Sequence, residues 1–248
     1  MPPAIPVLFV HGIRTSGTMW RRQLSMLAEE GHPALAIDLP GHGSRMREPF
    51  TVAGALAAID EGVDALGGRV LLVGLSLGGY YAIEYAARHP QKVAGLVAAG
   101  SCAIPGGWPL DAYRSLARLV RRLPDQGLWL HTTLVRVLLS PEGAADTLAG
   151  GVPLTVMDAG LGATGTLRPL DSLARYPGPV WLVNGSFDQF RLHERRFLAA
   201  CRNGRLVIVP RASHLVSLAQ PERFAAVLSG ILAEVASSRP GPIVDLSE

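Results

Sequence analysis

Cysteine is scarce in this chain of 248 residues, which contains only Cys102 and Cys201. Their separation along the sequence matches neither a zinc site nor a redox-active pair. The alternatives are one disulfide or two small buried side chains, and we favour the second, as in a reducing, cytoplasmic compartment. The histidines are also scattered without the spacing of metal ligands, so the sequence predicts no metal site.

Lysine is nearly absent too, with Lys92 as the only one, so almost all of the positive charge comes from arginine. The formal net charge is +3 and the isoelectric point is about 9.2, values that also occur in nucleic-acid-binding proteins. The arginines, however, are interspersed with acidic residues. The densest group (Arg118, Arg121 and Arg122) fits the solvent-exposed face of an amphipathic helix better than a phosphate-binding patch. We therefore expect no nucleic-acid partner.

Long hydrophobic runs are missing. No stretch reaches the roughly 18 apolar residues of a membrane span, and the best runs are as short as Val93–Ala99. The first residues lack the basic region of a secretory signal, so we expect a cytoplasmic protein. The hydrophobic fraction of 48% and the mean hydropathy of +0.26 exclude disorder for the bulk of the chain.

Short apolar runs alternate with amphipathic helical patterns through most of the sequence. This alternation predicts an α/β fold with a mostly parallel central sheet and helices on both faces. The expected strands are Val7–Val10, Ala34–Leu39, Val70–Gly74, Val93–Ala99, Val180–Val183 and Arg205–Val209. The expected helices between and after them span about 17–30, 51–66, 77–88, 190–201 and 221–236.

The alternation stops between Cys102 and Tyr176, where only helical patterns occur, over Leu110–Leu123, Leu128–Leu139 and Pro141–Ala149. We interpret residues 103–176 as a helical lid or cap inserted into a core of residues 1–102 and 177–236. Residues 237–248 are rich in Ser, Pro and Gly and are expected to form a flexible tail.

The strongest chemical signal is Gly74-Leu-Ser76-Leu-Gly78, which follows a buried strand and opens a helix. In this context the pattern predicts a nucleophile elbow, a turn so tight that the serine adopts a strained backbone and the glycines avoid collisions. The turn would place Ser76 at the carboxyl edge of the sheet and at a helix N-terminus, which favours developing negative charge.

A serine hydroxyl needs a general base, and that base needs an orienting group. His214 follows the last expected strand, and Asp188 follows the strand before it, so both should lie at the same edge as Ser76. The chain order Ser, Asp, His differs from the orders of chymotrypsin and subtilisin.

Several further segments strengthen this pattern. They are Phe9-Val-His11-Gly12, Asp38-Leu-Pro-Gly-His42-Gly43, Gly185-Ser-Phe-Asp188 and Ser213-His214. Together with the elbow they span nearly the whole chain, which resembles the α/β-hydrolase superfamily, in particular its compact, cofactor-free members with a helical cap.

The resemblance implies that Ser76 is the nucleophile, His214 the general base and then acid, and Asp188 the orienting carboxylate. It also implies an oxyanion hole formed by the backbone N–H groups of Ile13 and Leu77. Enzymes of this fold that are dehalogenases or epoxide hydrolases have aspartate at the elbow, so Ser76 favours a route through an acyl-enzyme.

The substrate depends on the cap. An apolar ceiling would suit a small hydrophobic substrate, although packing is the alternative for each residue taken singly. The candidate substrate-binding residues are Arg14, Tyr80, Trp108, Tyr113, Trp129 and Met157. Arg14, Arg45 or Arg47 would be the place for a substrate carboxylate.

The leading hypothesis is a serine hydrolase that cleaves carboxylic esters, lactones included. The first alternative uses the same three side chains for thioester hydrolysis or cyclisation in a biosynthetic pathway, C–C bond hydrolysis or perhydrolysis. A second alternative is a ligand-binding receptor without turnover. The sequence leaves both a monomer and a homodimer open.

Overall fold

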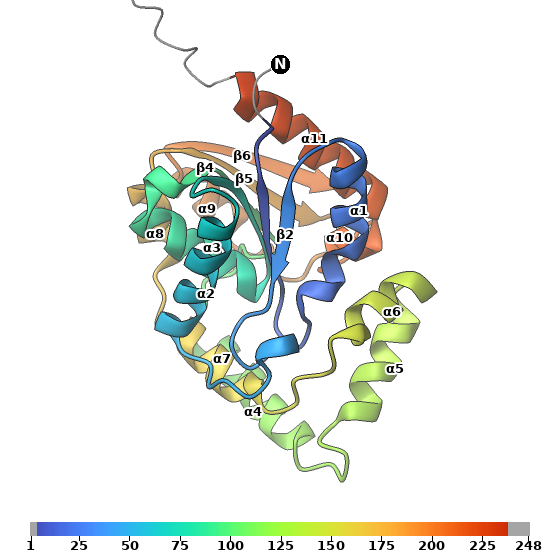
Figure 1. Ribbon diagram of the computed structural model, residues 1–248. Coiled ribbons are helices and arrows are strands. Elements are labelled where there is room, and N and C mark those ends of the chain that lie inside the picture. Colours follow the sequence, from blue (N-terminus) through green and yellow to red (C-terminus); the bar gives the residue numbers. More distant parts are fainter. Residues whose placement is uncertain (1–3, 238–248) are drawn as a thin grey trace, which may run out of the picture.

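The computed structural model describes residues 4–237, and a six-stranded sheet runs through its centre (Figure 1). The strand order is β2-β1-β3-β4-β5-β6, and every neighbouring pair is parallel. The strands are β1 (Val7–Val10), β2 (Ala34–Ile37), β3 (Val70–Leu75), β4 (Val93–Ala99), β5 (Pro179–Gly185) and β6 (Asn203–Val209). The order reverses between β1 and β3, and in open α/β sheets ligands bind beyond the carboxyl ends of strands at such a point.

Helices cover both faces of the sheet (Figure 1). One face carries α2 (Val52–Ala65), α3 (Leu77–Arg88), α8 (Pro169–Arg175) and α9 (Glu194–Ala200). The other face carries α1 (Arg21–Glu29), α10 (Val216–Ala219) and α11 (Pro221–Ser237). Short 3₁₀ helices are η1 (Gly17–Trp20), η2 (Gly43–Arg45) and η3 (Pro90–Lys92). The α/β fold expected from the sequence, a parallel central sheet with helices on both faces, is confirmed.

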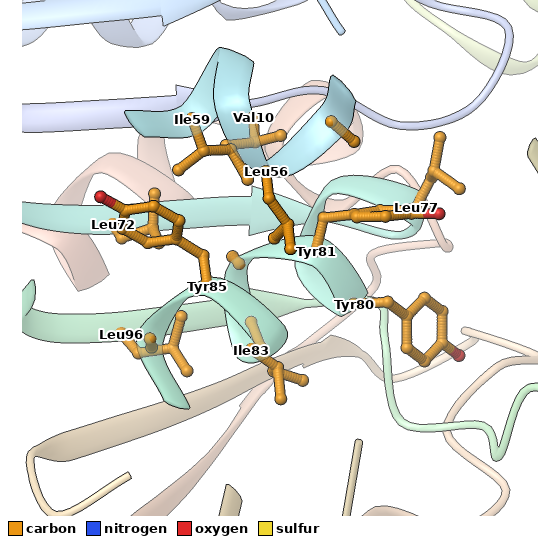
Figure 2. Close-up of a cluster of buried hydrophobic side chains, with 14 of the residues drawn as sticks. Val10, Leu56, Ile59, Leu72, Leu77, Tyr80, Tyr81, Ile83, Tyr85 and Leu96 are labelled. Atoms are coloured by element: carbon orange, nitrogen blue, oxygen red, sulfur yellow. The ribbon is translucent and has the colours of Figure 1, made fainter. Parts of the chain in front are cut away.

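The alternating directions of strand side chains divide the core in two. In β1, Leu8 and Val10 point to the cluster beneath α2 and α3, whereas Val7 and Phe9 join the cluster beneath α1 and α11. Figure 2 shows the first cluster, in which α3 side chains such as Tyr85 pack over the sheet. Because both faces are covered, the central strands are apolar throughout, which explains their continuous hydrophobic runs.

Residues 107–164 form a helical insertion of α4 (Gly107–Val120), α5 (Leu128–Leu138), α6 (Pro141–Ala149) and α7 (Val156–Thr164). These helices lie beyond the carboxyl ends of the strands, with α4 beside α7 and α5 beside α6 (Figure 1). The range 103–176 expected for the cap also contains α8, which packs against α3 and α9, and the buried Leu173 and Tyr176, which join the core cluster.

The only lysine lies at the opposite edge of the sheet. Lys92 directly precedes β4, and its Nζ is 2.7 Å from carboxylate oxygens of both Asp60 and Asp64 on α2. These carboxylates are partly or largely exposed, so the pairs contribute about 0–1 kcal/mol each.

Both cysteines are free: Cys102 is buried and Cys201 is half-buried. No helix within residues 4–237 combines the length and the apolar character needed to cross a membrane. Apart from Ser237, the tail expected over 237–248 lies outside the described residues.

Candidate active site

Ser76 occupies a strained turn between β3 and α3. Its φ of 52° and ψ of −115° fall where residues other than glycine are rarely found. Such a backbone costs on the order of 1–3 kcal/mol and persists only when its surroundings fix it. One such restraint is the Ser76 N–H, which donates to the Ala99 carbonyl at 2.8 Å. The turn directs the serine to the carboxyl edge of the sheet.

The glycines on either side allow this turn to close. A Cβ on Gly74 would collide with the carbonyl of Gly78, and a Cβ on Gly78 would collide with the carbonyl of Val10. Both obstacles are backbone atoms, which cannot rotate away. The spacing of two residues on each side of Ser76 is thus a steric requirement of the elbow.

Three loops bring Ser76, Asp188 and His214 together. His214 Nε2 lies 3.0 Å from Ser76 Oγ, and His214 Nδ1 lies 3.0 Å from Asp188 Oδ1. With the proton on Nδ1 donated to the carboxylate, Nε2 is free to accept the hydrogen bond of the serine hydroxyl. The Asp188 side chain is fully buried, while 17% of the His214 side chain is exposed. Chemically, the arrangement can transfer the proton of Ser76 to a base held in one tautomer.

Phe190 supports this arrangement and was not foreseen from the sequence. Its N–H donates to Asp188 Oδ1 at 2.7 Å, and its ring centroid lies 4.5 Å from that of His214. The available signal was the spacing, because aspartate side chains often accept from the N–H two residues further on. Gly100 lies beside the imidazole, since a Cβ there would be 3.0 Å from His214 Nδ1.

The turn after β1 lies beside the elbow. A Cβ built on Gly12, the residue before Ile13, would be 3.6 Å from the Cβ of Ser76. Leu77 begins α3, and N–H groups in a first helical turn have no partner within the helix. Within the described residues, neither N–H is donated to another protein group. Both N–H groups are therefore without a protein acceptor in the part of the chain that the structure describes, as donors to an oxyanion must be before substrate binds.

Two buried histidines and an aspartate fix the loops at this edge. His11 Nδ1 donates to the Gly12 carbonyl at 2.8 Å, and its Nε2 accepts the Leu39 N–H at 3.0 Å. Burial lowers the pKa of His11. Burial, followed by the electrostatic interaction between the two rings, lowers the pKa of His42 to about 3. Both rings are therefore held neutral.

Asp38 ties the second loop to the first. Its Oδ1 accepts the Gly17 N–H at 2.7 Å, and its Oδ2 accepts the Ser44 N–H at 2.8 Å. Burial alone would raise the pKa of Asp38, but these hydrogen bonds outweigh it and lower the pKa below its usual value.

The expected apolar ceiling is only partly present. Trp108 and Trp129 are 80% and 70% exposed, so the structure does not place them in a closed apolar ceiling, and their expected contact with substrate stays a prediction. The physical reason is that α4 packs mainly on α7, and α5 on α6, which leaves the other sides of α4 and α5 open to solvent. Met157 of α7 is buried, as expected for a packing or lining residue.

Among the remaining candidates, Tyr80 is a packing residue, whereas Arg14 and Tyr113 are still candidates for substrate binding. Tyr80 is buried, and its hydroxyl donates to the Ala103 carbonyl at 2.6 Å, which favours packing over substrate contact. Arg14 lies within electrostatic range of both Tyr113 on α4 and His131 on α5. No sequence pattern indicated His131, because its position depends on how the helical insertion packs.

A groove of about 530 Å³ lies between α5, α6 and the loops after β5 and β6, and none of Ser76, Asp188 and His214 lines it. Leu138, Phe187 and Ser213 are among its lining residues, so it borders the loops that carry Asp188 and His214. The described residues contain no group of three or more His, Cys, Asp or Glu side chains arranged to hold a metal ion.

Known proteins share both the sequence and this architecture. The profile of the alpha/beta hydrolase family matches residues 7–227. A pimeloyl-[acyl-carrier protein] methyl ester esterase of Neisseria meningitidis is 30% identical, over 92% of this chain and 93% of its own length. A 2-succinyl-6-hydroxy-2,4-cyclohexadiene-1-carboxylate synthase of Serratia proteamaculans is 28% identical, over 91% and 92% of the two chains.

Among solved structures, a thermophilic esterase from Thermogutta terrifontis superposes with a TM-score of 0.77 and 26% identity. The match covers 95% of this chain and 92% of that esterase. The family profile spans nearly all of the sheet and the three loops that carry Ser76, Asp188 and His214. The chain therefore belongs to the alpha/beta hydrolase family and is an enzyme.

Proposed function

We propose that this enzyme is a serine hydrolase that cleaves carboxylic esters, lactones included, of a small hydrophobic substrate. The observation that carries the proposal is the continuous hydrogen-bonded line from Ser76 through His214 to Asp188. Two relatives that match over more than nine-tenths of both chains, one by sequence and one by structure, are named esterases, which supports the same class of reaction here.

In the proposed mechanism, Ser76 Oγ attacks the ester carbonyl while His214 Nε2 takes the hydroxyl proton. Asp188 stabilises the imidazolium that forms. The tetrahedral intermediate then collapses, the C–O bond of the ester breaks, and His214 returns the proton to the departing alcohol. Water, deprotonated by His214, attacks the acyl-Ser76 and releases the acid.

The N–H groups of Ile13 and Leu77 are proposed to hold the oxyanion of the tetrahedral intermediate. Each such donor is worth roughly 3 kcal/mol in the transition state. The N-terminus of α3 adds favourable electrostatics at the same point. The helical insertion between β4 and β5 is proposed to act as the cap over this site.

The principal alternative uses the same three side chains for a different reaction: thioester hydrolysis or cyclisation, C–C bond hydrolysis or perhydrolysis. The relative from Serratia proteamaculans, which matches over nearly the full length of both chains, is named a synthase and not an esterase, so similarity of this degree extends beyond esterases. A panel of aryl esters, lactones and acyl-thioesters, assayed side by side, separates these reactions. The proposal requires that oxygen esters or lactones be the best substrates.

The decisive test combines turnover with active-site labelling. Wild-type protein should hydrolyse an aryl ester and react with a fluorophosphonate at Ser76, and Ser76→Ala should do neither. Ser229→Ala is the matched control, because this serine lies on α11 and bonds to Glu30. Labelling that survives in Ser76→Ala, or wild-type protein that neither turns over esters nor becomes labelled, would overturn the proposal.

A further inference from the structure

Arg14 adopts a backbone conformation that its own residue type disfavours. Its φ is 61°, in the left-handed region that glycine adopts without steric cost and that other residues adopt only with strain. Strain of this kind clusters where a side chain has a task in binding or catalysis. The residue immediately follows Ile13, one of the two proposed oxyanion donors.

The guanidinium of Arg14 lacks an anionic partner within the described residues. Its Nε is buried without any hydrogen bond, whereas Arg45 pairs with Glu48 and Glu61. An unpaired cation that is partly withdrawn from water is costly, and burial accordingly lowers the pKa of Arg14. A bound anion would remove that cost.

A second unsatisfied group lies close by. His131 of α5 has a buried Nε2 without a hydrogen-bond partner in the described structure. Burial, together with the charge of Arg14, lowers the pKa of His131 to about 4, so the ring is neutral at neutral pH and can donate one N–H. Tyr113 of α4 is the third neighbour of Arg14. The insertion thus brings His131 and Tyr113 within electrostatic range of Arg14, which directly follows Ile13.

We propose that Arg14 and His131 bind a carboxylate of the substrate, so that the preferred substrate is an ester carrying a free carboxylate, such as the half-ester of a dicarboxylic acid. This inference rests on the proposed ester hydrolysis and specifies its substrate class. Because the carboxylate site adjoins the oxyanion turn, the ester carbonyl reaches Ser76 while the distal carboxylate meets Arg14.

The charge at the site favours a carboxylate over a phosphate dianion. Arg14 supplies one full positive charge and the neutral His131 supplies only a hydrogen bond. The two arginines of α4, Arg114 and Arg118, share the carboxylate of Asp158 at 3.0 Å each, so both already have an anionic partner. A single guanidinium balances a single negative charge.

The kinetic test compares half-methyl esters of linear dicarboxylic acids, from succinate upward, with the corresponding dimethyl esters. Wild-type enzyme should have the higher kcat/KM for a half-ester. In Arg14→Gln, KM for that half-ester should rise about 10- to 100-fold, the range for losing a hydrogen bond to a charged group, with little change for the dimethyl ester. Arg14→Lys should retain part of the preference, and Arg136→Gln, on the exposed side of α5, should retain all of it.

A strain control separates folding from binding. Arg14→Gly should relax the backbone and lose the half-ester preference. Gln126→Gly should relax a similar strain, at φ 54°, and keep the preference, because the Gln126 side chain is uncharged and exposed.

Binding to Ser76→Ala provides a readout that does not require turnover. Titration calorimetry should detect a dicarboxylate, and NMR of His131 should show a rise in the pKa of its ring when the dicarboxylate binds. Arg14→Gln in the same background should abolish both signals. Inorganic phosphate, used as a competitor, should bind more weakly.

The outcomes distinguish the two proposals. Absence of any ester turnover and of Ser76 labelling defeats the proposed function. Normal turnover of dimethyl esters without a preference for half-esters, or a preference that Arg14→Gln leaves intact, overturns the carboxylate site alone. Phosphate binding tighter than the dicarboxylate would overturn the assignment of the anion.

Discussion

Phe190 and Asp188 are joined by a hydrogen bond of 2.7 Å from the Phe190 N–H to the same carboxylate oxygen that faces His214. The ring of Phe190 also packs against the imidazole. One residue therefore restrains both members of the pair, and the carboxylate oxygen cannot turn away from His214 without losing a backbone bond. Because this restraint fixes the side chain, a substitution of the same shape can remove the charge of Asp188 without moving the group.

Replacing Asp188 with asparagine should leave the fold intact and reduce kcat for an aryl ester by roughly 10⁴-fold. The amide keeps the shape of the side chain but neither holds the imidazole in the required tautomer nor stabilises its charged form. Stopped-flow or steady-state kinetics, with a thermal unfolding curve for each variant, measures both effects. Asp111→Asn, at an exposed position of α4, is the control and should behave as wild type. A near-normal rate in Asp188→Asn would assign the role to another carboxylate.

Gly74→Ala should destabilise the protein by about 3 kcal/mol, because the new methyl group meets the backbone of Gly78. The matched control is Gly230→Ala in α11, where a Cβ would have no atom within 4 Å. There the helix gains about 1 kcal/mol, since alanine has the higher helix propensity. Urea unfolding of both variants should therefore give shifts of opposite sign, and equal shifts would contradict the steric account of the elbow.

Stability should fall on mild acidification because of His42. The pKa of His42 is about 3 in the folded protein and 6.5 is its ordinary value, so between these limits the unfolded chain binds the extra proton. The contribution of His42 to the free energy of unfolding is thus complete above pH 6.5 and declines by about 1.4 kcal/mol per pH unit below it.

His42→Gln should remove this dependence. Between about pH 7.5 and pH 5, the wild-type free energy of unfolding should fall by about 2 kcal/mol more than that of the variant. His32→Gln, at a partly exposed position, should retain the wild-type slope. Parallel slopes in wild type and His42→Gln, measured by urea unfolding at both pH values, would show that His42 titrates normally.

The sheet was predictable because its strands are buried on both faces and read as unbroken apolar runs. The boundaries of β1 and β4 are as expected, whereas β2 ends two residues early, at Ile37 instead of Leu39. The elbow was predictable because its glycines are required locally: a Cβ on Gly74 or Gly78 would collide with backbone atoms. The convergence of Ser76, Asp188 and His214 followed from parallel strands ending at a common edge.

The helical insertion was less predictable. Helix α7 was not foreseen, since its sequence contains Gly160 and Gly162 and its burial comes from packing against α4 and α3. The exposure of Trp108 and Trp129 was missed because a hydrophobic side chain alone does not indicate which neighbour covers it. The position of His131 near Arg14 likewise depends on tertiary packing that no local pattern records.

The solitary lysine has a practical consequence. Lys92 lies at the amino end of β4, at the edge of the sheet opposite Ser76, and its amine faces Asp60 and Asp64. Amine-reactive resins or dyes that couple through side chains have one point of attachment, remote from the chemistry. Immobilisation through that amine would orient every molecule alike, with the loops around Ser76 turned toward the bulk solution.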